Sequence, residues 1–202
     1  MNEIPKENTS PTPPTPTKKD SFKDIARFTF FALLIVIPFR MFVAQPYVVS
    51  GLSMDPTFKN GDYLIVDQLT PRFQELSRGE VLIFKYPLDP SRSFIKRVIG
   101  LPGETVEIAS GEVRIKNTEN PVGFILDEPY VLYPKDSGLV VTLKDDEYFM
   151  MGDNRAGSLD SRSWGPLNRK FIIGHPVIRL LPISHIDILP GDHSTYEKTQ
   201  KN

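Results

Sequence analysis

The sequence contains no cysteine, has only 3 histidines and carries almost no net charge over its 202 residues. The absence of cysteine excludes disulfide bonds, a thiol nucleophile and a zinc site built from thiolates. A formal net charge of −1 provides no strong field for attracting nucleic acid, so we expect no nucleic-acid partner. We also expect no metal and no cofactor. The length suffices for one domain with a hydrophobic core plus an anchor, but not for two large domains.

Both ends of the chain are polar. Residues 1–20 are rich in proline, threonine, serine and charged residues. Because such a segment buries too little apolar surface to offset its ordering entropy, we predict a disordered tail there. We predict a second, flexible tail over residues 191–202.

One apolar stretch extends from Phe28 to Ala44. Its uninterrupted part is only about half of the roughly 20 residues that a bilayer crossing takes, so a full crossing requires Arg40 near the far surface. A buried core helix would lack a second helix to pack against. A cleaved signal peptide would place Phe42 where a small residue is needed. We therefore predict one transmembrane helix over residues 22–44.

Basic residues precede this stretch at Lys18, Lys19, Lys23 and Arg27. By the positive-inside rule, the N-terminus is cytoplasmic and the chain after Ala44 is exported.

The rest of the chain alternates short runs rich in valine, isoleucine and aromatic residues with turn residues, and it lacks a long amphipathic helical pattern. We predict a mainly β, antiparallel domain over residues 45–190. Its predicted strands are Tyr63–Val66, Glu80–Tyr86, Phe94–Ile99, Glu104–Ile108, Glu112–Lys116, Leu139–Leu143, Tyr148–Met151 and Ile172–Leu181. Its predicted turns are Gly100–Gly103, Ser110–Gly111 and Asp145–Asp146.

Ser53 is the candidate nucleophile. It lies between Gly51 and Pro56, which favours a bent backbone that holds the hydroxyl clear of a sheet. This pattern alone is weak, because serine is common in turns without any catalytic role. A serine hydroxyl also needs a base that accepts its proton.

Histidine and lysine are the two alternatives for that base. His193 lies in a polar tail beside Gly191 and Asp192, where we expect no catalytic role. Spacing does not exclude His175 or His185, since a Ser-His-Asp triad is assembled in space, but neither has a distinctive context. Lys96 is predicted to share an apolar strand face with Phe94, and burial there would lower its pKa enough for it to accept a proton. A strand-edge lysine that reaches solvent fits the same pattern.

A dense set of polar side chains follows a predicted strand over residues 152–165. Such a set fits either a solvated loop or a support that orients active groups. Trp164, the only tryptophan, indicates that the stretch is pinned to the fold, which favours the second interpretation.

The order of these features resembles the type I signal peptidase family, the S26 serine peptidases that use a Ser-Lys dyad. After the apolar stretch come four motifs, which are residues 50–57 (SGLSMDPT), 61–66 (GDYLIV), 96–104 (KRVIGLPGE) and the polar stretch that begins GDNR at Gly152. The resemblance spans most of the chain.

The resemblance implies a serine endopeptidase that removes signal peptides from exported preproteins at the outer face of the membrane. Ser53 would attack the scissile carbonyl and form an acyl-enzyme, while neutral Lys96 would take the hydroxyl proton. Ser158 would orient the lysine. The other implied supporting residues are Asp153, Arg155, Asp160 and Arg162.

The implied substrates have small residues at positions −1 and −3, and the implied pocket wall consists of Val49, Phe58, Phe94 and Ile95. Val49 and Phe94 would also pair with an extended substrate. Some members have a serine at the position of Gly51 that helps the oxyanion hole. Here the backbone N–H of Ser53 would be the main donor.

The implied partners are preprotein signal peptides and the lipid bilayer, in the cell inner (plasma) membrane or a thylakoid membrane. Ser53 lies nine residues beyond Ala44, a distance of at most about 30 Å, which would keep it near the membrane surface. Two other functions are a catalytically dead relative that binds preproteins and a self-cleaving Ser-Lys peptidase of the SOS-repressor kind. The intact Ser53 and Lys96 argue against the first, and the anchor against the second.

Overall fold

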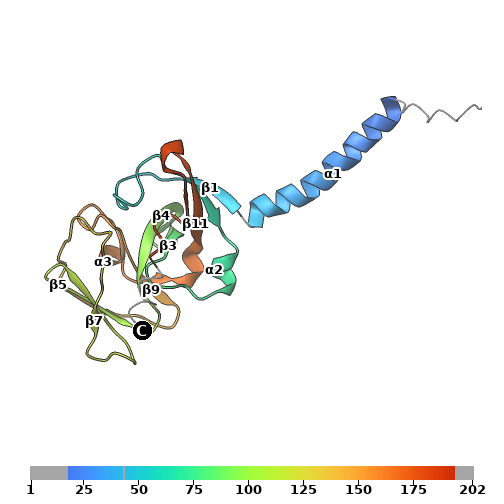
Figure 1. Ribbon diagram of the computed structural model, residues 1–202. Coiled ribbons are helices and arrows are strands. Elements are labelled where there is room, and N and C mark those ends of the chain that lie inside the picture. Colours follow the sequence, from blue (N-terminus) through green and yellow to red (C-terminus); the bar gives the residue numbers. More distant parts are fainter. Residues whose placement is uncertain (1–17, 43, 194–202) are drawn as a thin grey trace, which may run out of the picture. The chain divides into compact units, whose positions relative to one another are not determined.

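The computed structural model describes residues 18–42 and 44–193 (Figure 1). The chain divides into two units, residues 1–39 and 40–202. The predicted N-terminal tail lies outside the described residues up to position 17, whereas Lys18–Asp20 already belong to a helix. The predicted C-terminal tail lies outside them from position 194 on.

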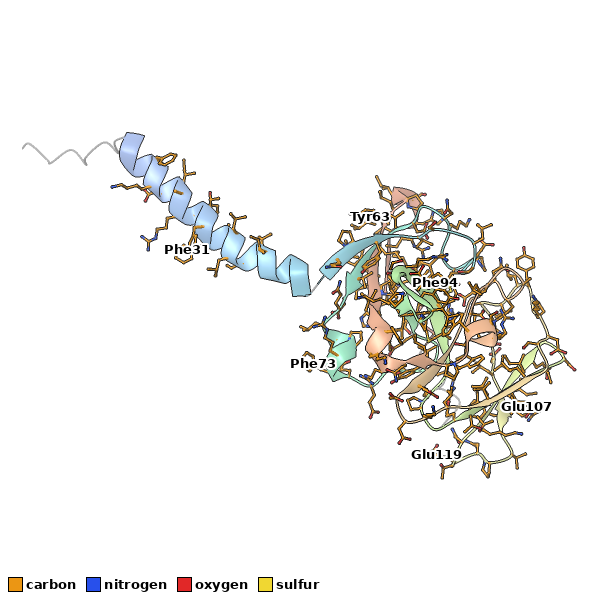
Figure 2. The ribbon with its side chains drawn as sticks, turned by 180° about the vertical axis from the view of Figure 1, so that it is seen from behind. Phe31, Tyr63, Phe73, Phe94, Glu107 and Glu119 are labelled. Atoms are coloured by element: carbon orange, nitrogen blue, oxygen red, sulfur yellow. The ribbon has the colours of Figure 1, made fainter. Side chains whose placement is uncertain are left out.

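Helix α1 (Lys18–Phe42) has 25 residues and forms most of the first unit. Apolar side chains are exposed along it, among them Phe28, Phe31 and Ile35 (Figure 2). No helix in the described ranges combines the length and the apolar character needed to cross a membrane.

The second unit is built on an antiparallel sheet of 8 strands in the order β1-β2-β11-β3-β4-β9-β10, with β12 paired to β11. The longest strand, β4, pairs with β3 from Asp89 to Arg97 and with β9 from Arg97 to Gly100. The strands of this sheet are β1 (Ala44–Val48), β2 (Tyr63–Asp67), β3 (Val81–Tyr86), β4 (Asp89–Gly100), β9 (Glu147–Met151), β10 (Leu167–Asn168), β11 (Ile172–Leu181) and β12 (Asp187–Ile188).

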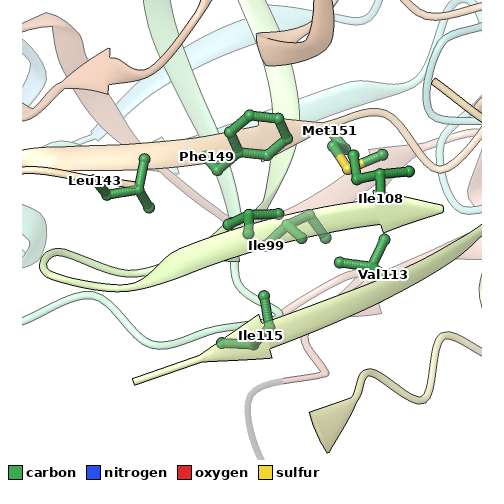
Figure 3. Packing of buried hydrophobic residues seen from close by; sticks show 8 residues of the cluster. Ile99, Ile108, Val113, Ile115, Leu143, Phe149 and Met151 are labelled. Atoms are coloured by element: carbon green, nitrogen blue, oxygen red, sulfur yellow. The ribbon is translucent and has the colours of Figure 1, made fainter. Parts of the chain in front are cut away.

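A smaller antiparallel sheet has 4 strands in the order β7-β6-β5-β8. Its buried face packs on the end of β4 and on β9, around Ile99, Val113 and Phe149 (Figure 3). Gly100 lies at this junction, where a Cβ atom would come within 2.5 Å of Val106 Cγ2, so only glycine fits. The strands are β5 (Thr105–Ala109), β6 (Glu112–Lys116), β7 (Phe124–Ile125) and β8 (Leu139–Thr142).

Short helical turns connect these strands. They are α2 (Thr70–Phe73), α3 (Ser161–Trp164), η1 (Arg169–Phe171) and η2 (Ile183–His185). Asp160 caps α3 by accepting a hydrogen bond from the backbone N–H of Arg162. The next residue, Ser161, accepts a hydrogen bond from the backbone N–H of Met150 on β9. The C-terminal end of the polar stretch is therefore also attached to β9.

The mainly antiparallel β fold that the sequence predicts is confirmed, and each predicted strand corresponds to a strand of the structure. The Ser110–Gly111 turn is also confirmed, since both residues have positive φ as a type I′ hairpin requires. Sequence reasoning missed β1, which is an edge strand interrupted in pattern by Pro46. It also missed β7, β10 and β12, which are too short to show an alternating pattern.

Two valines of the small sheet provide a matched test of its core. We expect Val113→Ala to lower the free energy of unfolding by about 2 kcal/mol, because Val113 is fully buried and its removed methyl groups leave a cavity. Val140→Ala, at a position 64% exposed on β8, should change it by less than about 0.5 kcal/mol. Urea unfolding of both variants measures the difference, and equal effects would contradict this core.

Candidate active site

Ser53 lies in the loop of residues 50–60 that follows β1, here named the serine loop. Gly51 adopts φ +100° and donates its N–H to Asn60 Oδ1 over 3.0 Å, which closes the loop on itself. Met54 and Phe58 are buried and anchor the loop in the core under the large sheet. The Ser53 side chain is therefore held at the surface end of a rigid turn. No described residue accepts a hydrogen bond from the Ser53 backbone N–H.

Lys96 reaches Ser53 from strand β4. Its Nζ lies 2.6 Å from Ser53 Oγ and 2.8 Å from the carbonyl oxygen of Ile95. The lysine is only 3% exposed, and the ring of Phe94 lies 5.3 Å from its Nζ. The structure thus brings together the serine and the lysine that the sequence singled out, 43 residues apart along the chain.

Burial lowers the pKa of Lys96 to about 8, and the charges of Asp160 and Asp153 act in the opposite direction without outweighing it. Desolvation disfavours the ammonium form because the buried charge loses its hydration. At mildly alkaline pH, a large share of Lys96 is the neutral amine, which can accept a proton from the adjacent hydroxyl.

Arg97, the next residue on β4, points to the other face and forms a buried ion pair with Asp153. Its Nε lies 2.8 Å from Asp153 Oδ1 and its Nη2 lies 2.6 Å from Oδ2. The same guanidinium donates to the carbonyl oxygens of Gly79 and Gly191. Asp153 also accepts a hydrogen bond from Thr57 Oγ1 at 2.5 Å, which connects the serine loop to the polar stretch.

The polar stretch of residues 152–165 contacts the serine loop directly. The backbone N–H of Asn154 donates to the Ser53 carbonyl oxygen over 3.1 Å, and its Nδ2 donates to the Leu52 carbonyl oxygen over 3.1 Å. Gly152 is required at this contact, because a Cβ atom there would lie 2.3 Å from both the Ser53 oxygen and Ser158 Oγ. The stretch is therefore a packed part of the site and not a solvated loop.

Buried charges hold the polar stretch in shape. Arg155 pairs with Glu128, and Arg162 donates to Asp160 and to the Arg155 carbonyl oxygen. Asp160 also accepts the Gly152 N–H over 3.1 Å. Burial acts to raise the pKa of Asp160, but the hydrogen bonds and charge of Arg162 outweigh it, so that this pKa is lower than usual. Asp160 is consequently a fixed anion near Lys96.

Ser158 lies beside Gly152 with its hydroxyl buried. Within residues 18–42 and 44–193, the hydrogen-bond acceptors of Lys96 Nζ are Ser53 Oγ and the Ile95 oxygen, and Ser158 is not among them. Ser158, which the resemblance implies would orient the lysine, therefore makes no direct hydrogen bond to it in this structure.

A cleft of about 360 Å³ opens beside Ser53 and Lys96. Val49, Phe94 and Ile95 line it as expected. Phe58 does not, because it is fully buried in the core beneath the serine loop, where Arg179 covers its ring at 5.3 Å. Sequence reasoning missed other lining residues, which are Tyr47, Val48, Ser50, Leu52, Leu64, Ile83, Arg92, Ser93, Gly157 and Leu159.

The three histidines lie away from the cleft. His175 Nε2 is 3.6 Å from Asp67 Oδ2, and His185 contacts Ser184. His193 packs against Tyr130, with the two rings tilted by 38°. None of the cleft-lining residues of the described chain is a histidine, so the structure does not assemble a Ser-His-Asp triad at Ser53.

Sequence reasoning also missed three residues that support the site. Arg97 follows the candidate lysine directly, and its place within the motif of residues 96–104 could have indicated that it supports the site. Thr57 ends the serine motif, and its contact with Asp153 spans 96 residues. Glu128 lies in no motif, so only the fold reveals its ion pair with Arg155.

The family model for signal peptidases, peptidase family S26, matches residues 22–181. This chain belongs to that family. It is therefore a signal peptidase I, a serine endopeptidase of a membrane-associated family that removes signal peptides.

Similar proteins agree with this assignment. The chain is 36% identical to probable signal peptidase I-1 of Synechocystis sp. over 85% of this chain and 88% of that protein. It is 32% identical to probable signal peptidase I-2 of the same organism, over 86% of this chain and 80% of that protein. It is 35% identical to signal peptidase I V of Bacillus subtilis, over 73% of this chain and 95% of that protein.

The Arg97–Asp153 pair generates a stability prediction. We expect Asp153→Asn to lower the free energy of unfolding by about 3–5 kcal/mol, because it leaves the charge of Arg97 buried without a counter-ion. The control is Glu107→Gln on β5, whose ion pair with Lys116 is partly exposed and contributes at most about 1 kcal/mol. Chemical denaturation compares the two variants, and an equal loss would contradict this role of the pair.

Proposed function

We propose that Ser53 is the nucleophile of this signal peptidase and that Lys96 is its general base, acting through an acyl-enzyme. The observation that carries the proposal is the 2.6 Å contact between the lysine Nζ and the serine Oγ in a site that lowers the lysine pKa to about 8. Neutral Lys96 takes the hydroxyl proton as Ser53 Oγ bonds to the scissile carbonyl carbon. It then gives that proton to the leaving amine and later activates the water that hydrolyses the ester.

The polar stretch serves to position this pair. Asp153 and Arg97 fix the strand of Lys96, while Asp160, Arg162 and Arg155 fix the segment that supports Ser53. These groups are already engaged with one another, so they act as supports and not as proton carriers. Ser158 belongs to this support by its place beside Gly152.

The backbone N–H of Ser53 is the proposed oxyanion donor, because it has no acceptor in the described chain. The N–H of Gly51 is already used by Asn60 Oδ1. A substrate carbonyl that enters the cleft would therefore find the Ser53 N–H available, and one such donor is typically worth roughly 3–4 kcal/mol in an acyl-transfer enzyme.

The signal peptide binds as an added strand in the cleft. Strand β9 pairs with β4 only from Arg97 onward, so the edge of Ser93–Lys96 is not occupied by β9. Across the cleft, β1 forms the edge of the large sheet and leads to Val49. Apolar walls from Val49, Phe94 and Ile95 favour small side chains at −1 and −3 by limiting the space.

The apolar segment from Phe28 to Ala44 is the proposed anchor of the domain at the cell inner membrane, or at a thylakoid membrane, with the N-terminus cytoplasmic and the catalytic domain outside. Its exposed apolar side chains between Phe28 and Ile37 support this placement. Lys18, Lys19, Lys23 and Arg27 precede it and agree with the positive-inside rule.

Cleavage of a preprotein with Ala at −1 and −3 tests the dyad. We expect the full-length protein in detergent to cut it at that site, and Ser53→Ala and Lys96→Ala each to lose at least about 1,000-fold in kcat. Lys144→Ala is the matched control, because its side chain is 80% exposed in the connection between β8 and β9, and it should keep full activity. Full activity of Lys96→Ala would eliminate the lysine as base, and absence of cleavage by wild type would contradict the function.

The pH dependence of single-turnover cleavage tests the base separately. Protonated lysine has no lone pair for the serine proton, so the rate should fall about tenfold per pH unit below pH about 8 and level off above it. Circular dichroism at each pH verifies that the fold is retained. A rate that stays constant down to pH 6 would contradict a lysine base.

A further inference from the structure

Arg92 places a permanent positive charge in the cleft that the dyad does not use. It lies on β4 four residues before Lys96 and lines the same cleft. Among the described residues that line this cleft, only Arg92 and Lys96 have basic or acidic side chains, and Lys96 must be neutral to act as base. The rest of the lining is neutral, so Arg92 dominates the charge that a bound peptide meets.

Aromatic rings hold the Arg92 guanidinium in place. It lies 5.3 Å from the ring centre of Phe94 and 6.0 Å from that of Tyr86, and these two rings stack on each other at 4.5 Å. Phe94, the nearer of the two rings, is on β4 and is labelled in Figure 2. Such cation–π contacts orient an arginine while leaving its N–H groups free for a carboxylate.

One acidic group lies near Arg92 on the same hairpin. Asp89 interacts with Arg92 through space, and its carboxylate accepts hydrogen bonds from the Ser91 hydroxyl and N–H. Asp89 does not line the cleft. The charge presented to a peptide inside the cleft is therefore that of Arg92.

The cleft lining indicates which substrate residue meets Arg92. Arg92, Phe94 and Lys96 all line the cleft, and the Phe94 ring lies 5.3 Å from both the Arg92 guanidinium and the Lys96 Nζ, although the β3–β4 register shifts between Lys85 and Tyr86. A peptide strand that runs parallel to β4, with residue −1 at Lys96 and residue −3 at Phe94, brings residue −5 to Arg92. Residues −1, −3 and −5 of an extended peptide share a face.

We propose that Arg92 forms a charge-selective subsite for residue −5 of the signal peptide, which favours an acidic side chain there and disfavours a basic one. The proposal rests on the proposed function, since it places residue −1 of a bound signal peptide beside the Ser53–Lys96 pair. It adds a preference for charge to the selection of small residues at −1 and −3.

Three preproteins that differ only at −5, carrying Asp, Gln or Lys, test the subsite with the full-length protein in detergent. We expect kcat/KM to fall in the order Asp, Gln, Lys, with an Asp-to-Lys ratio of about fivefold at low salt, because partly exposed charge pairs are weak. The ratio should shrink at high salt as screening increases.

Variants of Arg92 test whether this residue causes the charge preference. Each variant is compared by its own Asp-to-Lys ratio of kcat/KM, so a change in its overall cleavage rate does not affect the comparison. Arg92→Glu should invert the order, Arg92→Gln should bring the ratio to about one, and Arg92→Lys should retain the wild-type order. Arg72→Gln, at an exposed arginine on α2 outside the cleft, should leave both the ratio and the activity unchanged.

A wild-type ratio of one, or an unchanged order in Arg92→Glu, would overturn the subsite while cleavage itself still supports the Ser53–Lys96 function. Failure to cut any of the three substrates would instead overturn the proposed function, and this inference with it.

Discussion

The buried ion pair between Arg97 and Asp153 is the interaction on which the site depends most. It joins β4 to the polar stretch, and Thr57 joins the serine loop to the same carboxylate. Burying two charges is costly, and the cost is offset here because both carboxylate oxygens and the guanidinium are hydrogen-bonded and the Tyr130 ring covers the arginine at 3.9 Å. Three segments far apart in sequence are thereby held at one point.

Two adjacent basic residues on β4 consequently lie in different environments. Arg97 is ion-paired with a buried carboxylate, whereas Lys96 lies on the other face among Phe94, Ser53 and the Ile95 carbonyl, where burial lowers its pKa to about 8. The alternation of side chains along a strand is enough to separate the two environments. A structural arginine next to a lysine of lowered pKa is thus a direct product of strand geometry.

The sequence allowed the mainly β fold, most strands and the candidate pair to be predicted, because these depend on local pattern and on ordered motifs. Strand β1 escaped prediction because Pro46 interrupts its pattern, and Phe58 was placed in the pocket although it packs in the core. The contacts of Arg97, Thr57 and Glu128 were not predictable, because each joins residues that only the tertiary fold brings together. Whether a side chain lines a cleft or the core likewise depends on loop geometry that residue type does not encode.

The contact between Gly191 and Arg97 has a consequence for the order of assembly. The Gly191 carbonyl accepts from an arginine 94 residues earlier, and its α-carbon packs so closely that a Cβ atom would lie 2.5 Å from Thr57 Cγ2. A contact of such long sequence separation cannot form before both residues have been synthesised and the chain between them has closed into a loop. During synthesis, Ser53, Lys96 and Asp153 all emerge before this last segment exists. The chain therefore acquires its fully supported site only after nearly all of it has been translated.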